Sequence, residues 1–82
     1  MEPRVEPERA VIGRLFYDKV IEQAKQNRGK WGQQDTSRLI QVCQVQLGQI
    51  ADQFLKNGYS EKMKIELVHL GAVLYELYTA QA

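Results

Sequence analysis

Residues 57–80 read NGYSEKMKIELVHLGAVLYELYTA and decide the fold, because they join a helix boundary to a very apolar helix. Gly58 suits the left-handed residue that closes a helix, and the side-chain oxygen of Ser60 can cap the next one. After Ser60, apolar residues recur at helical spacing in two adjacent stripes: Met63, Leu67, Leu70, Leu74 and Leu77, then Ile65, Val68, Ala72, Tyr75 and Thr79. A helix that is apolar on two sides needs neighbours on two sides. The stretch therefore predicts an all-α bundle.

Two further helices precede this one. Gly29 can close the first helix, Pro7 suits its first turn, and Asp35, Thr36 or Ser37 can cap the second. Helical apolar spacing lies between these marks: Ile12, Phe16, Val20 and Ala24, then Leu39, Cys43, Leu47, Ile50 and Phe54. We expect helices at about 7–27, 36–57 and 61–80. They form a single domain over 1–82, with 1–6 as a flexible tail.

Three helices leave one stripe of the last helix without cover, so we predict a homodimer or a larger oligomer. The alternative is that the first helix wraps both stripes. The composition argues against two other classes of partner. A formal charge of +1 argues against sequence-specific DNA binding, and no apolar run is long enough to span a membrane. A single cysteine and the absence of a secretion signal predict a cytoplasmic protein.

Four polar side chains are expected to meet between the last two helices. Gln46 and Gln49 share one helix face, and Glu66 and His69 share another. Antiparallel packing about Gly58 brings the two pairs together inside an apolar bundle, where polar groups need each other, water or a ligand. Alternatively, the glutamines hydrogen-bond across a dimer seam, and His69 is a satisfied core histidine.

The stretch KWGQQ at residues 30–34 resembles a ligand loop. Basic residues surround it (Lys25, Arg28, Lys30 and Arg38), and Asp35 is the opposite charge nearby. Trp31 offers a flat face for a base, although it can equally plug the end of the bundle. Gln33 and Gln34 can each donate and accept a hydrogen bond. The amino-terminal amides of the second helix are a further expected anion site.

KWGQQ, LGQIADQFL at 47–55 and IELVHLGAVLYEL at 65–77 together resemble the small MazG-like members of the all-α nucleoside triphosphate pyrophosphohydrolases. The resemblance covers roughly residues 22–78. It implies a helical bundle in which carboxylates of the last two helices hold Mg²⁺, and the metal grips a triphosphate while water cleaves between the α and β phosphates.

This sequence keeps only one of the four carboxylates that the resemblance implies. Gln46 and Gln49 stand at the first glutamate pair, Glu66 matches the first acid of the second pair, and His69 replaces the aspartate. Amide oxygens are poor substitutes for charged Mg²⁺ ligands. Losing three carboxylates removes on the order of 10 kcal/mol of attraction at an effective dielectric near 20, before desolvation offsets it. We therefore expect no ordinary metal-dependent turnover, no catalytic residue and no cofactor.

The sequence thus predicts a non-catalytic nucleotide-binding protein that sequesters a nucleotide or a nucleotide signal, as a viral sponge against a host defence signal would. The predicted binding residues are Arg28, Lys30, Trp31, Gln34, Arg38, Gln46, Gln49, Glu66 and His69. One alternative is a Mg²⁺-dependent nucleoside triphosphate pyrophosphohydrolase with a shifted or engineered site at Glu66 and Asp52. Another is a structural interaction module that binds no nucleotide.

Overall fold

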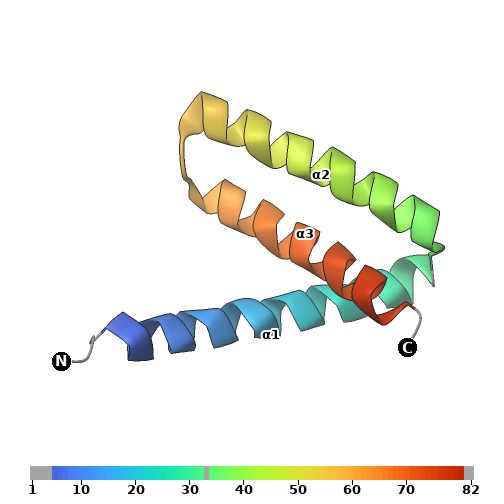
Figure 1. Cartoon of the computed structure of the whole chain (residues 1–82), viewed down its shortest axis with the longest axis horizontal. Helices are drawn as coiled ribbons and strands as arrows, with labels where there is room; N and C mark the ends of the chain where they lie inside the picture. Colours follow the sequence, from blue (N-terminus) through green and yellow to red (C-terminus); the bar gives the residue numbers. More distant parts are fainter. Residues whose placement is uncertain (1–4, 33, 81–82) are drawn as a thin grey trace.

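The computed structural model describes residues 5–32 and 34–80, which form three α-helices. They are α1 (Val5–Trp31), α2 (Thr36–Asn57) and α3 (Glu61–Thr79), and the described part of the chain contains no strand (Figure 1). The all-α prediction is confirmed. None of these helices combines the length and the apolar character that crossing a membrane requires.

Three predicted helix boundaries are confirmed by their capping contacts. Asp35 is the residue that caps α2, because its carboxylate accepts a hydrogen bond from the Arg38 backbone N–H at 2.8 Å. Ser60 caps α3 by accepting from the Met63 N–H at 3.3 Å. Gly58 closes α2 with a φ of 68°, and its N–H donates to the Phe54 carbonyl at 2.8 Å. Local side-chain chemistry therefore fixes the α2–α3 hairpin.

The predicted end of the first helix is wrong. Gly29 lies inside α1, which continues to Trp31, and the left-handed position belongs to Gly32, with a φ of 75°. The Gly32 N–H donates to the Arg28 carbonyl at 2.9 Å and so ends the helix one turn later. A glycine inside a helix costs only about 1 kcal/mol relative to alanine, so Gly29 does not stop it.

The amino end also departs from the expected tail. α1 begins at Val5, so residues 5 and 6 are helical. Residues 1–4 of the expected tail lie outside the described residues, as does Gln33 of the KWGQQ stretch.

The three helices form a single layer with α3 in the middle (Figure 1). α2 runs antiparallel to α3 on one side, and α1 crosses α3 on the other. Within the described residues no Cα–Cα distance under 8 Å links α1 to α2. The Cα trace measures 46 × 34 × 19 Å, which makes the layer thin. The flanks of α3 are thus covered by α1 and α2, with no further layer of helix above or below it in the described part of the chain.

The crossing of α1 over α3 is built from small residues. Val20 and Ala24 are the buried residues of α1, and Ala72 and Val73 are the buried residues of α3, among those that the structure describes. A Cβ placed on Gly71 would lie 2.8 Å from Val20 Cγ2 and 3.3 Å from Phe16 Cζ, so the glycine permits this close approach. Gly71 therefore sets how α1 sits on α3.

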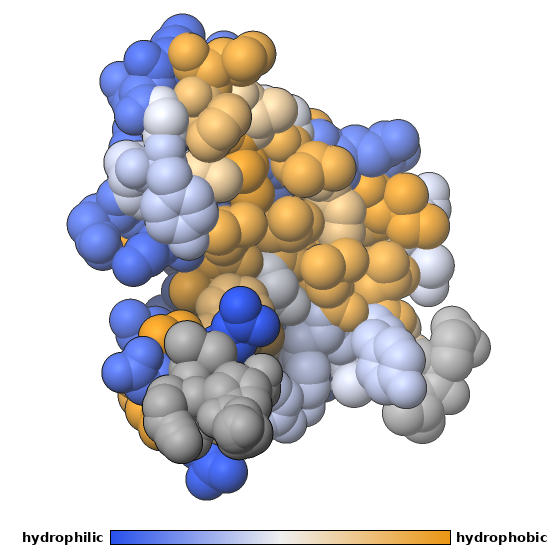
Figure 2. Space-filling view, turned by 60° about the vertical axis from the view of Figure 1, so that its left-hand side comes forward, coloured by the Kyte–Doolittle hydropathy of each residue, from blue (hydrophilic) through white to orange (hydrophobic). Residues whose placement is uncertain are grey.

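Hydrophobic side chains are only partly covered by this arrangement. Figure 2 shows them gathered in one broad patch, with polar residues along its edges. α1 and α2 cover opposite flanks of α3, yet Leu74 of the first α3 stripe stays about half exposed. Ile65 and Tyr75 of the second stripe are exposed as well, so exposure is divided between the two stripes, neither stripe is left wholly without cover, and the predicted oligomer stays a prediction.

Candidate functional site

A cleft of about 460 Å³ lies where the end of α1, the start of α2 and the second half of α3 meet. Its size falls within the range typical of small-molecule sites. Seven of the nine predicted binding residues line it: Arg28, Lys30, Trp31, Gln34, Arg38, Gln46 and His69. All three helices contribute to this one cavity, which makes it the candidate site.

The late end of α1 positions the basic side chains of the cleft. Arg28, Lys30 and Trp31 belong to the last turn of α1 and not to a loop, so the helix backbone holds them. The turn at Gly32 is tied back by Gln34, whose Nε2 donates to the Trp31 carbonyl at 3.2 Å. Arg38 then enters from the first turn of α2, directly after the Asp35 cap.

Charge in the cleft favours an anion. Three cationic side chains and one carboxylate, Glu76, line it, so the described lining carries two net positive charges (3 − 1 = 2) with His69 neutral. Arg28 Nη2 contacts Glu76 Oε1 at 3.1 Å, and the side chains are 51% and 13% exposed. Lys30 and Arg38 form no ion pair with another described residue. They are the cations available to a phosphate.

Trp31 presents an accessible aromatic surface at the rim. It is 62% exposed, which differs from the expectation that it plugs the end of the bundle. The Lys30 ammonium lies 5.4 Å from the ring centroid, within cation–π range. An aromatic face beside a cation can stack a base and contact its phosphate at the same time.

Amide side chains cover the inner wall. Gln23, Gln26, Asn27, Gln34 and Gln46 line the cleft, and Gln23 Nε2 donates to Asn27 Oδ1 at 3.0 Å. The Oε1 atom of Gln46 is buried and has no hydrogen-bond partner among the described residues. A buried acceptor left unpaired is costly, so this atom favours a donor from water or from a ligand.

Sequence reasoning missed the contribution of α1 to the inner wall. Gln23, Gln26 and Asn27 follow helical spacing and share one face of α1 with the predicted residue Lys30, so the amide spacing was the available signal. Glu76 was also missed, although it lies seven residues after His69 and so on the same side of α3.

Two predicted residues lie away from the cleft. Gln49 is exposed, and Glu66 is half-buried on α3 without lining the cavity. Each lies about one helical turn closer to the α2–α3 connection than its partner, Gln46 or His69. The expected meeting of four polar side chains is thus reduced to Gln46 and His69 at this site.

The residues present do not fit a Mg²⁺ site. Across residues 8–32 and 34–80, no three side chains of His, Cys, Asp or Glu lie close enough together to hold a metal ion. Asp52 forms an exposed pair with Lys56 at 3.3 Å, and Glu76 is paired with Arg28. Mg²⁺ needs charged oxygen ligands in a near-octahedral arrangement, which these separated carboxylates do not supply.

The amino end of α2 differs from the expected anion site. The Arg38 backbone N–H already donates a hydrogen bond to Asp35 Oδ1, with an N–O distance of 2.8 Å. A second anion at this helix end would meet that negative charge. These backbone amides are therefore a less favourable place for an anion than the side chains of Lys30 and Arg38.

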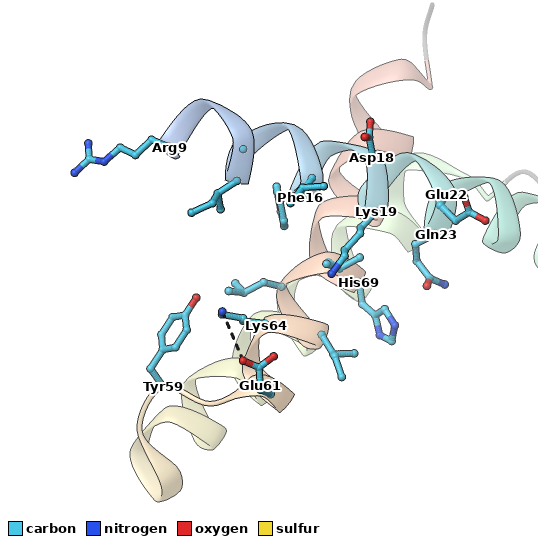
Figure 3. A pocket seen from close by; sticks show the side chains of 16 residues that line it. Arg9, Phe16, Asp18, Lys19, Glu22, Gln23, Tyr59, Glu61, Lys64 and His69 are labelled. Atoms are coloured by element: carbon cyan, nitrogen blue, oxygen red, sulfur yellow. Dashed lines mark ion pairs between the residues drawn. The ribbon is translucent and has the colours of Figure 1, made fainter. Parts of the chain in front are cut away.

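A larger hollow of about 1,110 Å³ lies between the first half of α1 and the first half of α3 (Figure 3). Apolar side chains form its floor, among them Ile12, Phe16 and Val68. Three basic and three acidic residues line it as well: Arg9, Lys19, Lys64, Asp18, Glu22 and Glu61. Lys64 pairs with Glu61 at 3.6 Å. This hollow has no net charge, so it does not share the anion preference of the smaller cleft.

Cys43 provides a pH test of its own burial on α2. Burial raises the pKa of its thiol above the ordinary value, so the folded chain holds the proton more tightly than the unfolded chain. This contribution to stability is complete below the unfolded pKa and is lost as the pH rises through the folded pKa. We expect alkylation by iodoacetamide to begin at higher pH for the folded protein than for the urea-unfolded protein. Identical pH profiles would contradict the burial.

Comparison with protein-family models, with curated proteins and with solved structures gave no match. The candidate site therefore rests on its own geometry and chemistry.

Proposed function

We propose that this protein binds a nucleotide or a nucleotide-derived signal in the cleft and holds it without cleaving it. The observation that carries the proposal is the convergence of Lys30, Arg38, Trp31 and the unpaired Gln46 oxygen on one cavity of ligand size. The resemblance of the sequence to MazG-like proteins supports the same class of ligand. A protein of this kind acts by sequestration, as a viral sponge against a nucleotide signal would.

The proposed binding mode divides the ligand into two parts. The phosphates contact Lys30 and Arg38 through charge-assisted hydrogen bonds, each worth about 1.5–3 kcal/mol before screening. The base stacks on Trp31, which is worth about 1–3 kcal/mol. An amino or hydroxyl group of the ligand donates to Gln46 Oε1. Ordering and desolvation oppose these gains, so we expect dissociation constants between about 1 µM and 1 mM.

Binding without hydrolysis follows from the carboxylates of the site. Glu76 is the one carboxylate among the described lining residues, and Arg28 already neutralises it. Metal-assisted phosphoryl chemistry needs several carboxylates to place the cation against the phosphates. The cleft instead meets the phosphates with its own cations, which makes a bound metal unnecessary for affinity.

The fluorescence of Trp31 tests the proposal, because this is the single tryptophan of the chain. We expect titration with ATP, UTP, or cyclic di- and trinucleotides in EDTA to change the emission of Trp31 saturably for at least one compound. N-acetyltryptophanamide, titrated in parallel, corrects for absorption by the nucleotide. Inorganic triphosphate separates phosphate binding from base stacking, because it lacks a base. No saturable change across the whole panel, with silent calorimetry, would end the proposal.

A further inference from the structure

The charge-free stretch of α2 is the feature that the binding cleft leaves unexplained. Residues 39–51 read LIQVCQVQLGQIA and contain no charged side chain. Ile40, Leu47 and Phe54 recur at seven-residue intervals, so they form one seam along α2. They are 46%, 58% and 52% exposed. A solvated helix face normally carries charges, so this seam has the composition of a covered surface.

The exposed part of α3 extends this apolar surface. The stripe from Met63 to Leu77 lies roughly 130° around the helix from His69 and Glu76, at about 100° per residue. Leu74 remains 49% exposed, and Tyr78 stays exposed just beyond it. On α2, the seam likewise lies roughly 120° from Gln46 and Val42 of the cleft. The seam and the stripe therefore belong to the face of the layer that is turned away from the cleft.

The surface area indicates how large a partner this face needs. The chain exposes 6400 Å², whereas a folded monomer of its mass typically exposes about 5,000 Å². The excess of about 1,400 Å² is spread over the whole chain, including the exposed first half of α1, and it is larger than the roughly 800 Å² that each partner buries in a stable protein interface. A single layer of helices also lacks the second layer around which domains build a core. A second layer of helices of similar size covers the excess surface and also completes a two-layer core.

We infer that a second copy of this chain supplies that layer, with α2 and α3 of the two copies forming a four-helix bundle. In a two-fold interface each residue near the axis meets its own copy, so a charge there would repel itself. The thirteen residues of the charge-free stretch avoid this repulsion completely. The seven-residue spacing of Ile40, Leu47 and Phe54 matches helices that cross at about 20°.

The dimer buries the seam and leaves the cleft open on the outer side of each copy. This inference does not depend on what the cleft binds, because the two surfaces use different faces of α2 and α3. Mass measurement tests it directly, since a monomer has a mass of 9.5 kDa and a dimer has twice that, 2 × 9.5 = 19 kDa.

Sedimentation equilibrium of the full chain at about 100 µM is expected to give the dimer mass. Leu47→Lys places two lysines against each other in the interface, so we expect the monomer mass and a dissociation constant raised at least 100-fold. Val45→Lys is the matched control, because Val45 is 59% exposed on the same helix but lies 200° around from Leu47. We expect this control to remain a dimer. Circular dichroism checks that both variants are helical.

Three results would overturn the inference. The first is a monomeric wild-type chain, which would leave the face to a different kind of partner. The second is a dimer that Leu47→Lys does not weaken. The third is dissociation by Val45→Lys, which would place the interface on the other side of α2. If Leu47→Lys does not fold, Leu47→Gln replaces it, with an expected increase of at least tenfold in the dissociation constant.

Discussion

Replacing Gly71 by leucine is expected to separate α1 from α3 and to lower the free energy of unfolding by about 3 kcal/mol. The Cβ alone would lie 2.8 Å from Val20 Cγ2 and 3.3 Å from Phe16 Cζ. Val20 is β-branched, with one strongly preferred rotamer in a helix, so its methyl group cannot easily move aside. Leucine regains up to about 1 kcal/mol of helix propensity, which offsets only part of the clash. Urea unfolding followed by circular dichroism measures the loss.

Comparing Gly71→Ala with Gly48→Ala separates the clash at Gly71 from the general effect of replacing a helical glycine by alanine. Nothing lies within 4 Å of a Cβ built on Gly48, so alanine there should gain helix propensity and raise stability by up to about 1 kcal/mol. Gly71→Ala should lower stability, and adding Val20→Ala should restore part of the loss by making room. The same effect at both glycines would contradict the close crossing of α1 and α3.

Reversing two charges of the cleft is expected to weaken nucleotide binding by at least about 100-fold. In Lys30→Glu with Arg38→Glu, two charge-assisted hydrogen bonds are lost, and two carboxylates then repel the phosphates. The lost bonds alone account for about 3 kcal/mol after screening, and 1.4 kcal/mol corresponds to a factor of ten. Calorimetric titration with the best ligand of the nucleotide panel measures the change.

The matched control is Arg14→Glu with Lys62→Glu. Both side chains are exposed and lie outside the cleft, and the net charge changes by the same amount, 2 × (−2) = −4. We expect the affinity of this control to stay within threefold of the wild type, because distant surface charges are screened. An equal loss in both double variants would mean that binding depends on overall charge and not on the cleft.

The sequence predicts those parts of the fold that depend on neighbouring residues. Asp35, Ser60 and Gly58 cap or close helices through contacts within one turn. Ser60 and Gly58 were predicted from residue type, and Asp35 was one of three predicted candidates. Gly29 and Gly32 show the limit, because both glycines can end a helix and the choice depends on whether one more turn is stabilised. That single turn moved Arg28, Lys30 and Trp31 from a loop onto a helix.

The candidate site shows the same division between local and distant structure. Gln46 and His69 reach one cleft because the short α2–α3 connection brings their helices together, which the sequence predicts. Gln49 and Glu66 lie outside that cleft, whose α1 wall is formed only by residues from Gln23 onward. Which part of α1 reaches the cleft depends on how α1 is set on α3, where Val20 and Phe16 approach Gly71 closely. The position of α1 along α3 depends on contacts between residues far apart in the chain, so it cannot be predicted from the local sequence pattern.

Calorimetry of nucleotide binding with and without magnesium tests the central claim most directly. The panel that contains ATP, UTP, and cyclic di- and trinucleotides is titrated once in EDTA and once in Mg²⁺, while an enzymatic assay follows pyrophosphate. We predict that the ligand that binds does so in EDTA, with no more than a threefold change in affinity on adding Mg²⁺ and no release of pyrophosphate. Binding that appears only with Mg²⁺, or pyrophosphate released from a nucleoside triphosphate, would contradict the account.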